Sequence, residues 1–292
     1  CIRDRFIILT PVYNDWKNLH KLMSKINKLF LYKIKQKFDL IIVDDCSLEK
    51  INFKRSQFKS IKNFKILRNY NNLGSQRAIA IGIKYIKTKY KKDSRVVVID
   101  SDGQDNPLGI LKLIHKFEKS NSSVVAKRGQ RKEALWFKMF YETYCFLIYF
   151  LTLKKIRYGN FSLIKFSDLE KILEDGNLWS AFPPTLSINL SKISTITIDR
   201  DKRYSGNSKM NFFGLFYHAL RVFSVLRFRV LIFSLIYISI FYLFFQNSYA
   251  MICILFLILL NISNFILSLF NTKNFTKNFK KIRVNNFSTF QY

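Results

Sequence analysis

The chain has 292 residues, of which 49% are hydrophobic and 16% aromatic, and its 49 Lys and Arg residues outnumber 19 Asp and Glu residues. A chain this apolar is not intrinsically disordered, and a formal net charge of +30 exceeds that of an ordinary soluble enzyme. Such an excess of cations suits nucleic acid, anionic lipid headgroups or a phosphorylated substrate. Because no recognised nucleic-acid-binding motif accompanies the charge, we expect no nucleic acid among the partners.

The cysteines form no recognisable pattern. Cys1, Cys46, Cys145 and Cys253 show no paired spacing, which argues against a disulfide framework and against a zinc site. Reduced thiols in a domain facing the cytosol fit best. The early apolar run Phe6–Leu9 is too short for a signal peptide, so we expect no export of the N-terminal part.

Short β-branched runs alternate with helical patterns from Arg5 to about Leu220. Strands are predicted at Phe6–Thr10, Leu40–Val43, Phe64–Leu67, Val96–Ile99 and Ser123–Ala126. Helices are predicted at about Trp16–Lys37, Gly74–Tyr90 and Leu108–Ser120. Strands of nearly continuous Ile, Val and Leu are buried on both faces. The pattern therefore predicts an α/β fold, with a mostly parallel, Rossmann-like sheet and helices on both faces.

The composition changes near Arg229. Val230–Phe245 and Tyr249–Phe270 are two apolar runs separated by a short polar stretch. The second run reaches the roughly 20 residues needed to span a bilayer, and the first, at about 16 residues, is marginal. We interpret the pair as a transmembrane helical hairpin. Two buried core helices are the alternative, although the chain offers no matching apolar partners for them.

Basic residues flank the hairpin on both sides, and the turn between its two runs carries no charge. The positive-inside rule then places both ends in the cytosol. Trp136–Leu153 and Met210–Phe228 also mix aromatic with basic residues in helical spacing, which is typical of helices at a headgroup boundary or of ordinary core packing. The flanking residues are Arg221, Arg227, Arg229, Lys273, Lys277, Lys280 and Lys281.

Polar loops follow the first four predicted strands. They are Thr10–Asp15, Val43–Ser47, Asn69–Gly74 and Asp100–Asp105. Because the carboxyl ends of parallel strands meet at one edge of a sheet, these loops should converge. Acidic and amide side chains beside a glycine, with cations nearby, suit a nucleotide diphosphate.

The loop after the fourth strand is the sharpest of these signals. Asp100 and Asp102 can aim two carboxylates, with the Gln104 amide oxygen, at one Mg²⁺ or Mn²⁺ ion. The alternative is an ordinary turn in which Asp105 or Asn106 caps the following helix.

The order and spacing of these loops resemble the family 2 glycosyltransferases of the GT-A fold, in particular dolichyl-phosphate mannose synthase and the bacterial polyprenyl-phosphate glycosyltransferases. The resemblance runs from Phe6 to Lys209 and continues through the two apolar runs. It implies an enzyme that transfers a sugar from a nucleotide-diphosphate sugar to a polyprenyl phosphate, either undecaprenyl or dolichyl. It also implies an integral membrane protein, with a bacterial inner membrane as the expected location.

The resemblance assigns roles on the donor side. Asp45 is implied to read the base, and the pattern Asp100-x-Asp102-x-Gln104-x-x-Pro107 matches the family's metal motif, with Asp102 and Gln104 as ligands and Asp100 as a third. The implied nucleotide-sugar-binding residues are Pro11, Tyr13, Asn14, Asp15, Asp44, Asp45, Gly74, Asp100 and Ser101.

On the acceptor side, Arg128 and Arg131 resemble an Arg-x-x-Arg element that suits a phosphate. The segment from Arg203 to Lys209 resembles a mobile Arg-x-x-Gly-x-Ser-Lys loop that closes over the phosphates and includes Ser208. Without the resemblance, both segments would pass as solvated basic turns. The implied catalytic residues are Asp102, Arg203, Lys209 and Asp105.

The segment Gly159–Leu163 departs from the family pattern. Its sequence is Gly-Asn-Phe-Ser-Leu, where the lipid-phosphate enzymes usually have Gly-Asp-Phe followed by Arg. Asn160 or Ser162 could hydrogen-bond a sugar hydroxyl, but no charged role carries over. A transferase that extends a cell-surface glycan or a lipid-linked oligosaccharide directly is therefore the alternative function.

We expect a one-step inverting reaction, in which an ionised acceptor phosphate needs no strong base, whereas a hydroxyl acceptor would need one and Asp105 is near enough to serve. An inactive membrane scaffold is a further alternative. The sugar, the nucleotide and the choice of metal stay open, as does a homo-oligomeric state. The expected divisions are a cytosolic GT-A domain over 1–209, a juxtamembrane amphipathic helix over 210–228, two transmembrane helices over 229–271 and a basic cytosolic tail over 272–292.

Overall fold

The structure is a computed structural model that describes residues 5–49, 53–91, 93–129, 135–206, 212–245, 247–274 and 289–290. Its strands are β1 (Arg5–Val12), β2 (Phe38–Asp44), β3 (Ile61–Arg68), β4 (Ser94–Val98), β5 (Ser123–Arg128), β6 (Tyr158–Lys165), β7 (Ile193–Ile198) and β8 (Thr289–Phe290). Its α-helices are α1 (Trp16–Leu29), α2 (Ser75–Lys89), α3 (Gly109–Ser120), α4 (Leu135–Thr152), α5 (Asp168–Glu174), α6 (Phe182–Asn189), α7 (Phe212–Val225), α8 (Arg227–Phe244) and α9 (Ser248–Asn274). Short helical turns are η1 (Phe30–Ile34), η2 (Arg55–Gln57) and η3 (Gly176–Trp179).

The strands form one sheet in the order β7-β5-β6-β4-β1-β2-β3-β8. β3, β2, β1 and β4 are parallel, β6 pairs antiparallel with both β4 and β5, and β7 is parallel to β5. This mostly parallel, GT-A-like sheet confirms the predicted fold class. The predicted strands correspond to β1 to β5, but β6, β7 and the two-residue strand β8 were not predicted. β6 contains a Gly-Asn pair that weakens its strand pattern, whereas the alternating Ile and Thr of β7 carried a readable signal.

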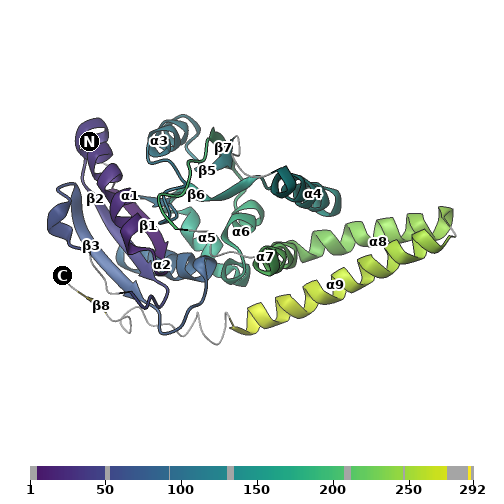
Figure 1. Cartoon of the computed structure of the whole chain (residues 1–292). Coiled ribbons are helices and arrows are strands. Elements are labelled where there is room, and N and C mark those ends of the chain that lie inside the picture. The colour runs from purple at the N-terminus through teal and green to yellow at the C-terminus, as the bar shows by residue number, and fades with distance from the viewer. Residues whose placement is uncertain are drawn as a thin grey trace.

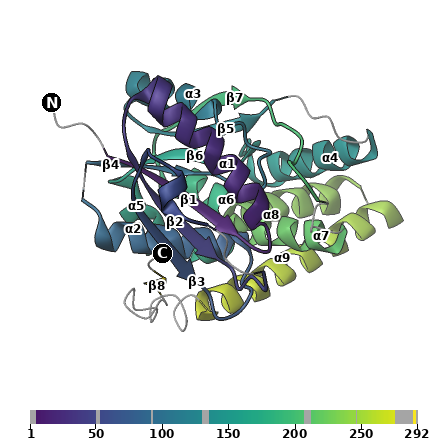
Figure 2. The ribbon, with the colours of Figure 1, turned by 60° about the vertical axis from the view of Figure 1, so that its left-hand side comes forward.

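Alternation along the central strands divides the core into two layers. In β1, Phe6 and Ile8 pack with α1 and α3, while Ile7 and Leu9 pack with α2, α5 and α6 on the other face. Successive side chains of a strand point to opposite faces, so a continuous apolar strand supplies both layers. Figures 1 and 2 show the helices on the two sides of the sheet.

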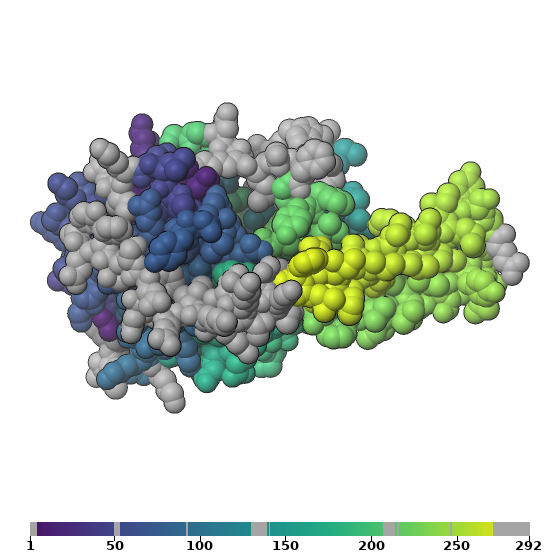
Figure 3. All heavy atoms as spheres, turned by 90° about the horizontal axis from the view of Figure 1, so that it is seen from below, coloured from purple at the N-terminus to yellow at the C-terminus, as the bar shows by residue number. Residues whose placement is uncertain are grey.

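Helices α8 and α9 lie side by side as a hairpin that extends away from the sheet (Figures 1 and 3). Both are long and apolar enough to cross a membrane, with mean hydropathies of 1.8 and 2.5 over their most apolar segments. Only 11% and 17% of those segments are buried. That low burial contrasts with the two buried core helices considered as the alternative.

A third apolar cluster joins the hairpin to the sheet domain. It combines side chains of α4, α7, α8 and α9, including Ile148, Phe223, Val230 and Leu257. Polar contacts support it, because Arg221 Nη2 donates to the Trp179 carbonyl at 3.0 Å. α4 therefore has both a packed side and exposed apolar side chains such as Phe146.

Candidate functional site

A cleft of about 380 Å³ opens at the carboxyl ends of β1, β2 and β4. The predicted loops do converge there, and they are joined by the later segment that carries Arg203 and by Gly214 of α7. Among the residues predicted to bind donor or metal or to act in catalysis, those lining the cleft are Pro11, Tyr13, Asp15, Asp45, Gly74, Asp100, Ser101, Asp102 and Arg203.

Asp45 organises the loop that precedes α2. Its Oδ1 accepts hydrogen bonds from Asn69 Nδ2 at 2.8 Å and from the Leu73 backbone N–H at 2.9 Å, and its Oδ2 accepts one from the Gly74 N–H at 2.7 Å. Gly74 has a φ of +89°, in the left-handed region that favours glycine. The Asp45 carboxylate thus fixes the start of α2 beside the cleft. This structural role exists in addition to its predicted contact with the nucleotide base.

Asn14 and Asp44 do not line this cleft; they brace its loops. The Asn14 N–H donates to Ser47 Oγ at 2.8 Å, and its Oδ1 accepts from the Leu48 N–H at 2.7 Å, which ties the β1 loop to the β2 loop. Asp44 is fully buried and lies 3.4 Å from Arg68 Nε. Their predicted nucleotide contacts stay predictions, and the structure gives both residues a supporting position.

Arg203 joins two acidic loops across the cleft. Its Nη2 lies 2.6 Å from Asp15 Oδ2 and its Nη1 lies 3.5 Å from Asp102 Oδ2. Asn18 of α1 supports the arrangement, because its Nδ2 donates both to Asp15 Oδ1 and to the Ser205 carbonyl. All three charged side chains are at most 19% exposed, so the interaction is stronger than a surface ion pair.

Further contacts fasten the segment around Arg203 to the Asp100–Asp105 loop. The Asp201 N–H donates to the Gln104 carbonyl at 2.9 Å. The backbones of Asp105 and Arg200 pair as a single antiparallel β-bridge. The Tyr204 ring packs so closely on Gly103 that a Cβ at Gly103 would come within 2.2 Å of it. Nζ of Lys25, a residue of α1, lies 4.4 Å from the centre of the Tyr204 ring.

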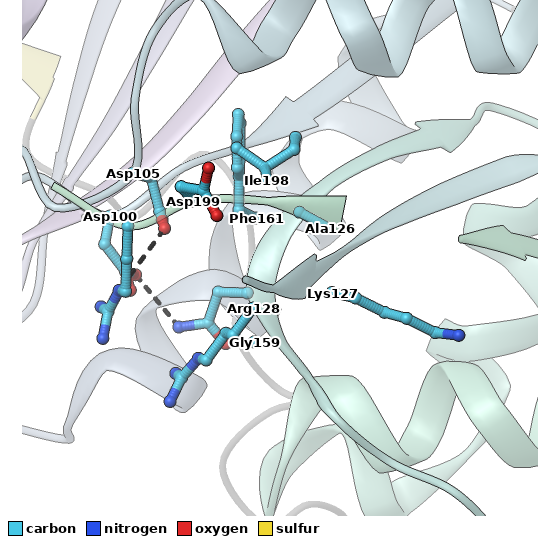
Figure 4. Close-up of a pocket in the computed structure, with 11 residues that line it drawn as sticks. Asp100, Asp105, Ala126, Lys127, Arg128, Gly159, Phe161, Ile198 and Asp199 are labelled. Atoms are coloured by element: carbon cyan, nitrogen blue, oxygen red, sulfur yellow. Dashed lines mark hydrogen bonds and ion pairs between the residues drawn. The ribbon is translucent and has the colours of Figure 1, made fainter. Parts of the chain in front are cut away.

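A smaller cavity of about 10 Å³ lies behind the cleft (Figure 4). Asp100 lines both spaces, while Asp105, Arg128 and Arg200 line the smaller one. Burial, reinforced by Asp100 and opposed by Arg200, raises the pKa of Asp105 to about 7. Burial and the neighbouring Asp102 raise the pKa of Asp100. An Asp105 carboxyl that titrates near neutral pH is suited to proton transfer.

The donor set suits a divalent cation that shares its ligands with a diphosphate. Asp100 and Asp102 both face the cleft, and Mg²⁺ is commonly held by one or two carboxylates together with substrate phosphates. Across the described ranges, no group of three or more His, Cys, Asp and Glu residues is arranged to hold a metal by itself. Gln104 does not line the cleft; its N–H donates to Asp102 Oδ1 at 3.0 Å.

The Gly159–Leu163 segment forms part of β6 beside Asp100. Asn160 Nδ2 donates to Asp100 Oδ1 at 3.0 Å, and Gln76 Nε2 donates to Asn160 Oδ1 at 3.0 Å. Ser162 is fully buried, and its Oγ donates to the Asn160 carbonyl at 2.9 Å. The expectation that Ser162 could contact a sugar hydroxyl is therefore wrong for this conformation, because β6 turns that side chain into the core.

Three predicted acceptor-side residues, Arg131, Ser208 and Lys209, lie outside the described residues. Four further residues that line or support the cleft and the smaller cavity were not predicted from the sequence. They are Asn18, Gln76, Arg200 and Gly214. Asn18 and Gln76 lie on helices and act through contacts with segments 187 and 84 residues away, which no local pattern reveals. For Asn18, the only local signal is its place three residues after Asp15 on the first turn of α1.

Comparison with known proteins gives the family. The family model "Glycosyl transferase family 2" matches residues 7–173. An uncharacterized glycosyltransferase of Bacillus subtilis, YkcC, is 31% identical over 46% of this chain and 40% of its own length. An uncharacterized glycosyltransferase of Synechocystis sp. is 26% identical over 73% of this chain and 66% of its own length. The matched parts thus span less than two thirds of either relative.

Among solved structures, glucosyl-3-phosphoglycerate synthase from Mycobacterium tuberculosis is similar in fold, with a TM-score of 0.51 and 15% sequence identity. The match covers 78% of this chain and 80% of the mycobacterial protein. The family model covers more than half of the chain, from β1 through α5, and includes every loop of the cleft except the Arg203 segment. The protein belongs to glycosyltransferase family 2 and is a glycosyltransferase.

Proposed function

We propose that this protein transfers a sugar from a nucleotide-diphosphate sugar to a polyprenyl phosphate at the cytosolic face of a membrane. The observation that carries the proposal is the composition of the cleft. Its wall combines the donor-side loops of the sheet with Gly214 of α7, the helix that leads into the α8–α9 hairpin. α7 also packs against α9 of the hairpin. A cleft that includes a residue of this helix is proposed to receive a soluble donor and a lipid-borne acceptor at the same point.

The donor half rests on the charges and hydrogen-bonding groups of the cleft. Asp45, Gly74 and Tyr13 line the cleft, and we propose that the base and ribose bind beside them. Arg203 lies beside Asp102, and its cation is proposed to contact the diphosphate. The mycobacterial synthase of similar fold was solved with UDP and Mn²⁺, which supports a nucleoside diphosphate and a divalent metal here. Asp100 and Asp102 would hold that metal with the diphosphate oxygens, and the predicted ligand Gln104 would need its side chain to turn toward the cleft.

The membrane half rests on the hairpin and the basic residues at its base. We propose that α8 and α9 cross the bilayer with both ends in the cytosol, because Arg227 and Arg229 lie in the first turn of α8 and Lys273 lies in the last turn of α9. α7 and the exposed side of α4 would then lie at the headgroup level, as the segment 210–228 was expected to do.

The chemistry that follows is an in-line displacement. An oxygen of the acceptor phosphate forms a bond to the anomeric carbon, while the bond from that carbon to the diphosphate oxygen breaks and its electron pair stays on the diphosphate. The metal, when bound, neutralises part of that charge. Arg203 supplies the rest from the protein, and Lys209 and Ser208 follow it in sequence on the same predicted phosphate-binding loop. A phosphate monoester is already ionised near neutral pH, so the reaction needs no strong base.

Purified full-length protein in detergent tests the proposal. It is given Mg²⁺ or Mn²⁺, a panel of UDP- and GDP-sugars, and undecaprenyl phosphate, and the lipid product is detected by mass. We expect one donor to give a glycosyl phosphate lipid. Asp102→Asn should abolish the product, whereas Glu174→Gln, a substitution at an exposed surface position, should not. If the Asp102→Asn protein folds and retains full activity, the proposal that sugar transfer takes place in this cleft is wrong.

The alternative acceptor is a glycan or a lipid-linked oligosaccharide. Asp105 favours it, because a carboxyl group with a pKa of about 7 could accept the proton of an attacking hydroxyl. A lipid-linked oligosaccharide offered in parallel decides between the two. Product from this acceptor alone, together with loss of activity in Asp105→Asn, would establish direct glycan extension in place of transfer to a phosphate.

A further inference from the structure

A chain of amide groups runs from α6 to Asp100 through the interior of the protein. The Phe182 N–H donates to Gln76 Oε1 at 2.7 Å, Gln76 Nε2 donates to Asn160 Oδ1 at 3.0 Å, and Asn160 Nδ2 donates to Asp100 Oδ1 at 3.0 Å. Gln76 is only 6% exposed and Phe182 is fully buried. The first link is therefore sheltered from water that could replace it, and the two links to Asn160 and from Asn160 to Asp100 are partly buried.

The first link determines the orientation of all the others. A backbone N–H can only donate, so it requires the amide oxygen of Gln76 and turns Gln76 Nε2 toward Asn160. That nitrogen in turn requires the oxygen of Asn160, which leaves Asn160 Nδ2 facing the carboxylate. Asp100 thus always receives an N–H from this direction.

The chain of amides ends at a carboxylate, Asp100, whose orientation matters for the cleft. Asp100 lies in the lining of both the cleft and the smaller cavity, where it and the carboxylates of Asp102 and Asp105 repel one another. Figure 4 shows Asp100 and Asp105 on one side of that cavity, with Arg128 and Gly159 nearby. With one oxygen held by a neutral donor, the carboxylate has a defined orientation despite its acidic neighbours.

We propose that Asn160 and Gln76 are positioning residues that hold the Asp100 carboxylate in the orientation needed to bind a divalent cation together with the donor diphosphate. This inference rests on the proposed nucleotide-sugar and metal dependence of the same cleft. It also explains why a neutral amide stands at position 160. The chain of amides needs a group there that accepts from Gln76 and donates to Asp100, and an amide does both.

Replacement of the amide at position 160 by a carboxylate is therefore expected to impair metal binding. Asn160→Asp keeps an acceptor for Gln76 but sets a second acceptor against Asp100 Oδ1. Gln76→Glu acts from further away: its carboxylate accepts from Phe182 and from Asn160, so the Asn160 amide reverses and turns its oxygen toward Asp100.

The positioning role can be tested without turnover by measuring how tightly the full-length protein in detergent binds Mn²⁺. The electron paramagnetic resonance signal of free Mn²⁺ reports this binding, once with UDP present and once with GDP. Asn160→Asp and Gln76→Glu should each weaken Mn²⁺ binding by about 10-fold or more. The matched control is Asn189→Asp, because Asn189 Nδ2 donates to Asp175 Oδ2 at 2.6 Å in a similar Asn–Asp pair away from the cleft. This control should bind Mn²⁺ like the wild type.

A double-mutant cycle keeps the test decisive if Asn160→Asp does not fold. In an Asn160→Ala background no amide remains to reverse, so Gln76→Glu should add less than about 2-fold to the loss of Mn²⁺ binding. Additive effects, or wild-type Mn²⁺ binding in folded Asn160→Asp and Gln76→Glu proteins, would overturn the inference. Tighter Mn²⁺ binding in Asn160→Asp would also overturn it, because position 160 would then be a ligand. Wild-type protein that binds no Mn²⁺ with either nucleotide would instead count against the proposed function.

Discussion

Arg203 Nη2 lies 2.6 Å from Asp15 Oδ2, although 188 residues separate the two in sequence. The same guanidinium reaches Asp102, so one side chain links the loop after β1, the loop after β4 and the segment after β7. Planar guanidinium groups suit such a bridge, because their N–H groups point in defined directions. The ion pairs lie in the lining of the cleft, where a diphosphate is proposed to bind.

Replacement of Arg203 should impair the reaction more than the fold. We expect Arg203→Ala to lower kcat by about 10²-fold, since it removes a cation from the proposed position of the leaving diphosphate. Arg203→Lys should recover little, because an ammonium group cannot bridge both carboxylates as a guanidinium does. Steady-state kinetics with the donor that the enzyme accepts gives kcat for both variants. Lys202→Ala, which changes an exposed neighbour in the same segment, should keep normal kcat, and an equal loss there would point to a general effect of loop charge.

Asp45→Asn should weaken donor binding by loosening the start of α2. The asparagine amide would turn its nitrogen toward one of the N–H groups that Asp45 now accepts from, and a buried unpaired donor costs about 1–3 kcal/mol. We expect a lower melting temperature and a higher dissociation constant for the donor nucleotide, measured by calorimetry. Unchanged values for both would show that the three hydrogen bonds to Asp45 do not organise this loop.

Gly103→Ala and Gly206→Ala form a matched pair. Their φ values are +78° and +76°, so both substitutions carry a similar backbone cost, of about 1–2 kcal/mol. A Cβ at Gly103 also meets the Tyr204 ring at 2.2 Å, whereas one at Gly206 meets nothing within 4 Å. Gly103→Ala should therefore lose more kcat/KM for the donor, because Tyr204 and the attached Arg203 segment must move. Equal losses for the two variants would mean that the Tyr204 contact has no influence on the cleft.

Half-buried His218 of α7 should make the protein less stable in mild acid. Burial, together with the Arg221 and Arg128 guanidinium groups, lowers the pKa of His218 from 6.5 to about 4. The unfolded chain therefore takes up a proton as the pH falls below about 6.5, while the folded chain does not do so until about 4, and stability is lost across that interval. The cost reaches at most about 2 kcal/mol at pH 5. Melting temperatures from pH 7 to 5 should fall less in His218→Gln, and parallel curves for the two proteins would contradict this assignment.

The orientation of the hairpin can be tested at its tip. In a background without other cysteines, Ser248→Cys at the start of α9 should react with a membrane-impermeant maleimide added outside intact cells, because the turn is proposed to face away from the cytosol. A cysteine at exposed Lys202 should react only after lysis. Labelling of Lys202→Cys in intact cells, or failure of Ser248→Cys to react until lysis, would reject the proposed orientation.

Local patterns in the sequence were enough to predict the framework. Runs such as Val96–Val98 are apolar enough to be buried on both faces, so they predicted central parallel strands and a shared edge for the loops that follow them. The two long apolar runs predicted α8 and α9 on the same grounds of length and composition. The carboxylates of the Asp100–Asp105 loop and the glycine before α2 were also found in this way, because each stands directly after a strand or before a helix.

Only the tertiary structure decided which side chains meet. The order of the strands brings β6 beside β4 in antiparallel pairing, and this places Asn160 against Asp100 and Gln76. The Arg203 segment returns after β7 to close on loops more than 100 residues earlier in the chain. Such contacts depend on strand order and on the direction of each side chain, which are properties of the whole sheet. A local pattern can predict that a residue is polar and lies in a loop, but its hydrogen-bond partner follows from the fold.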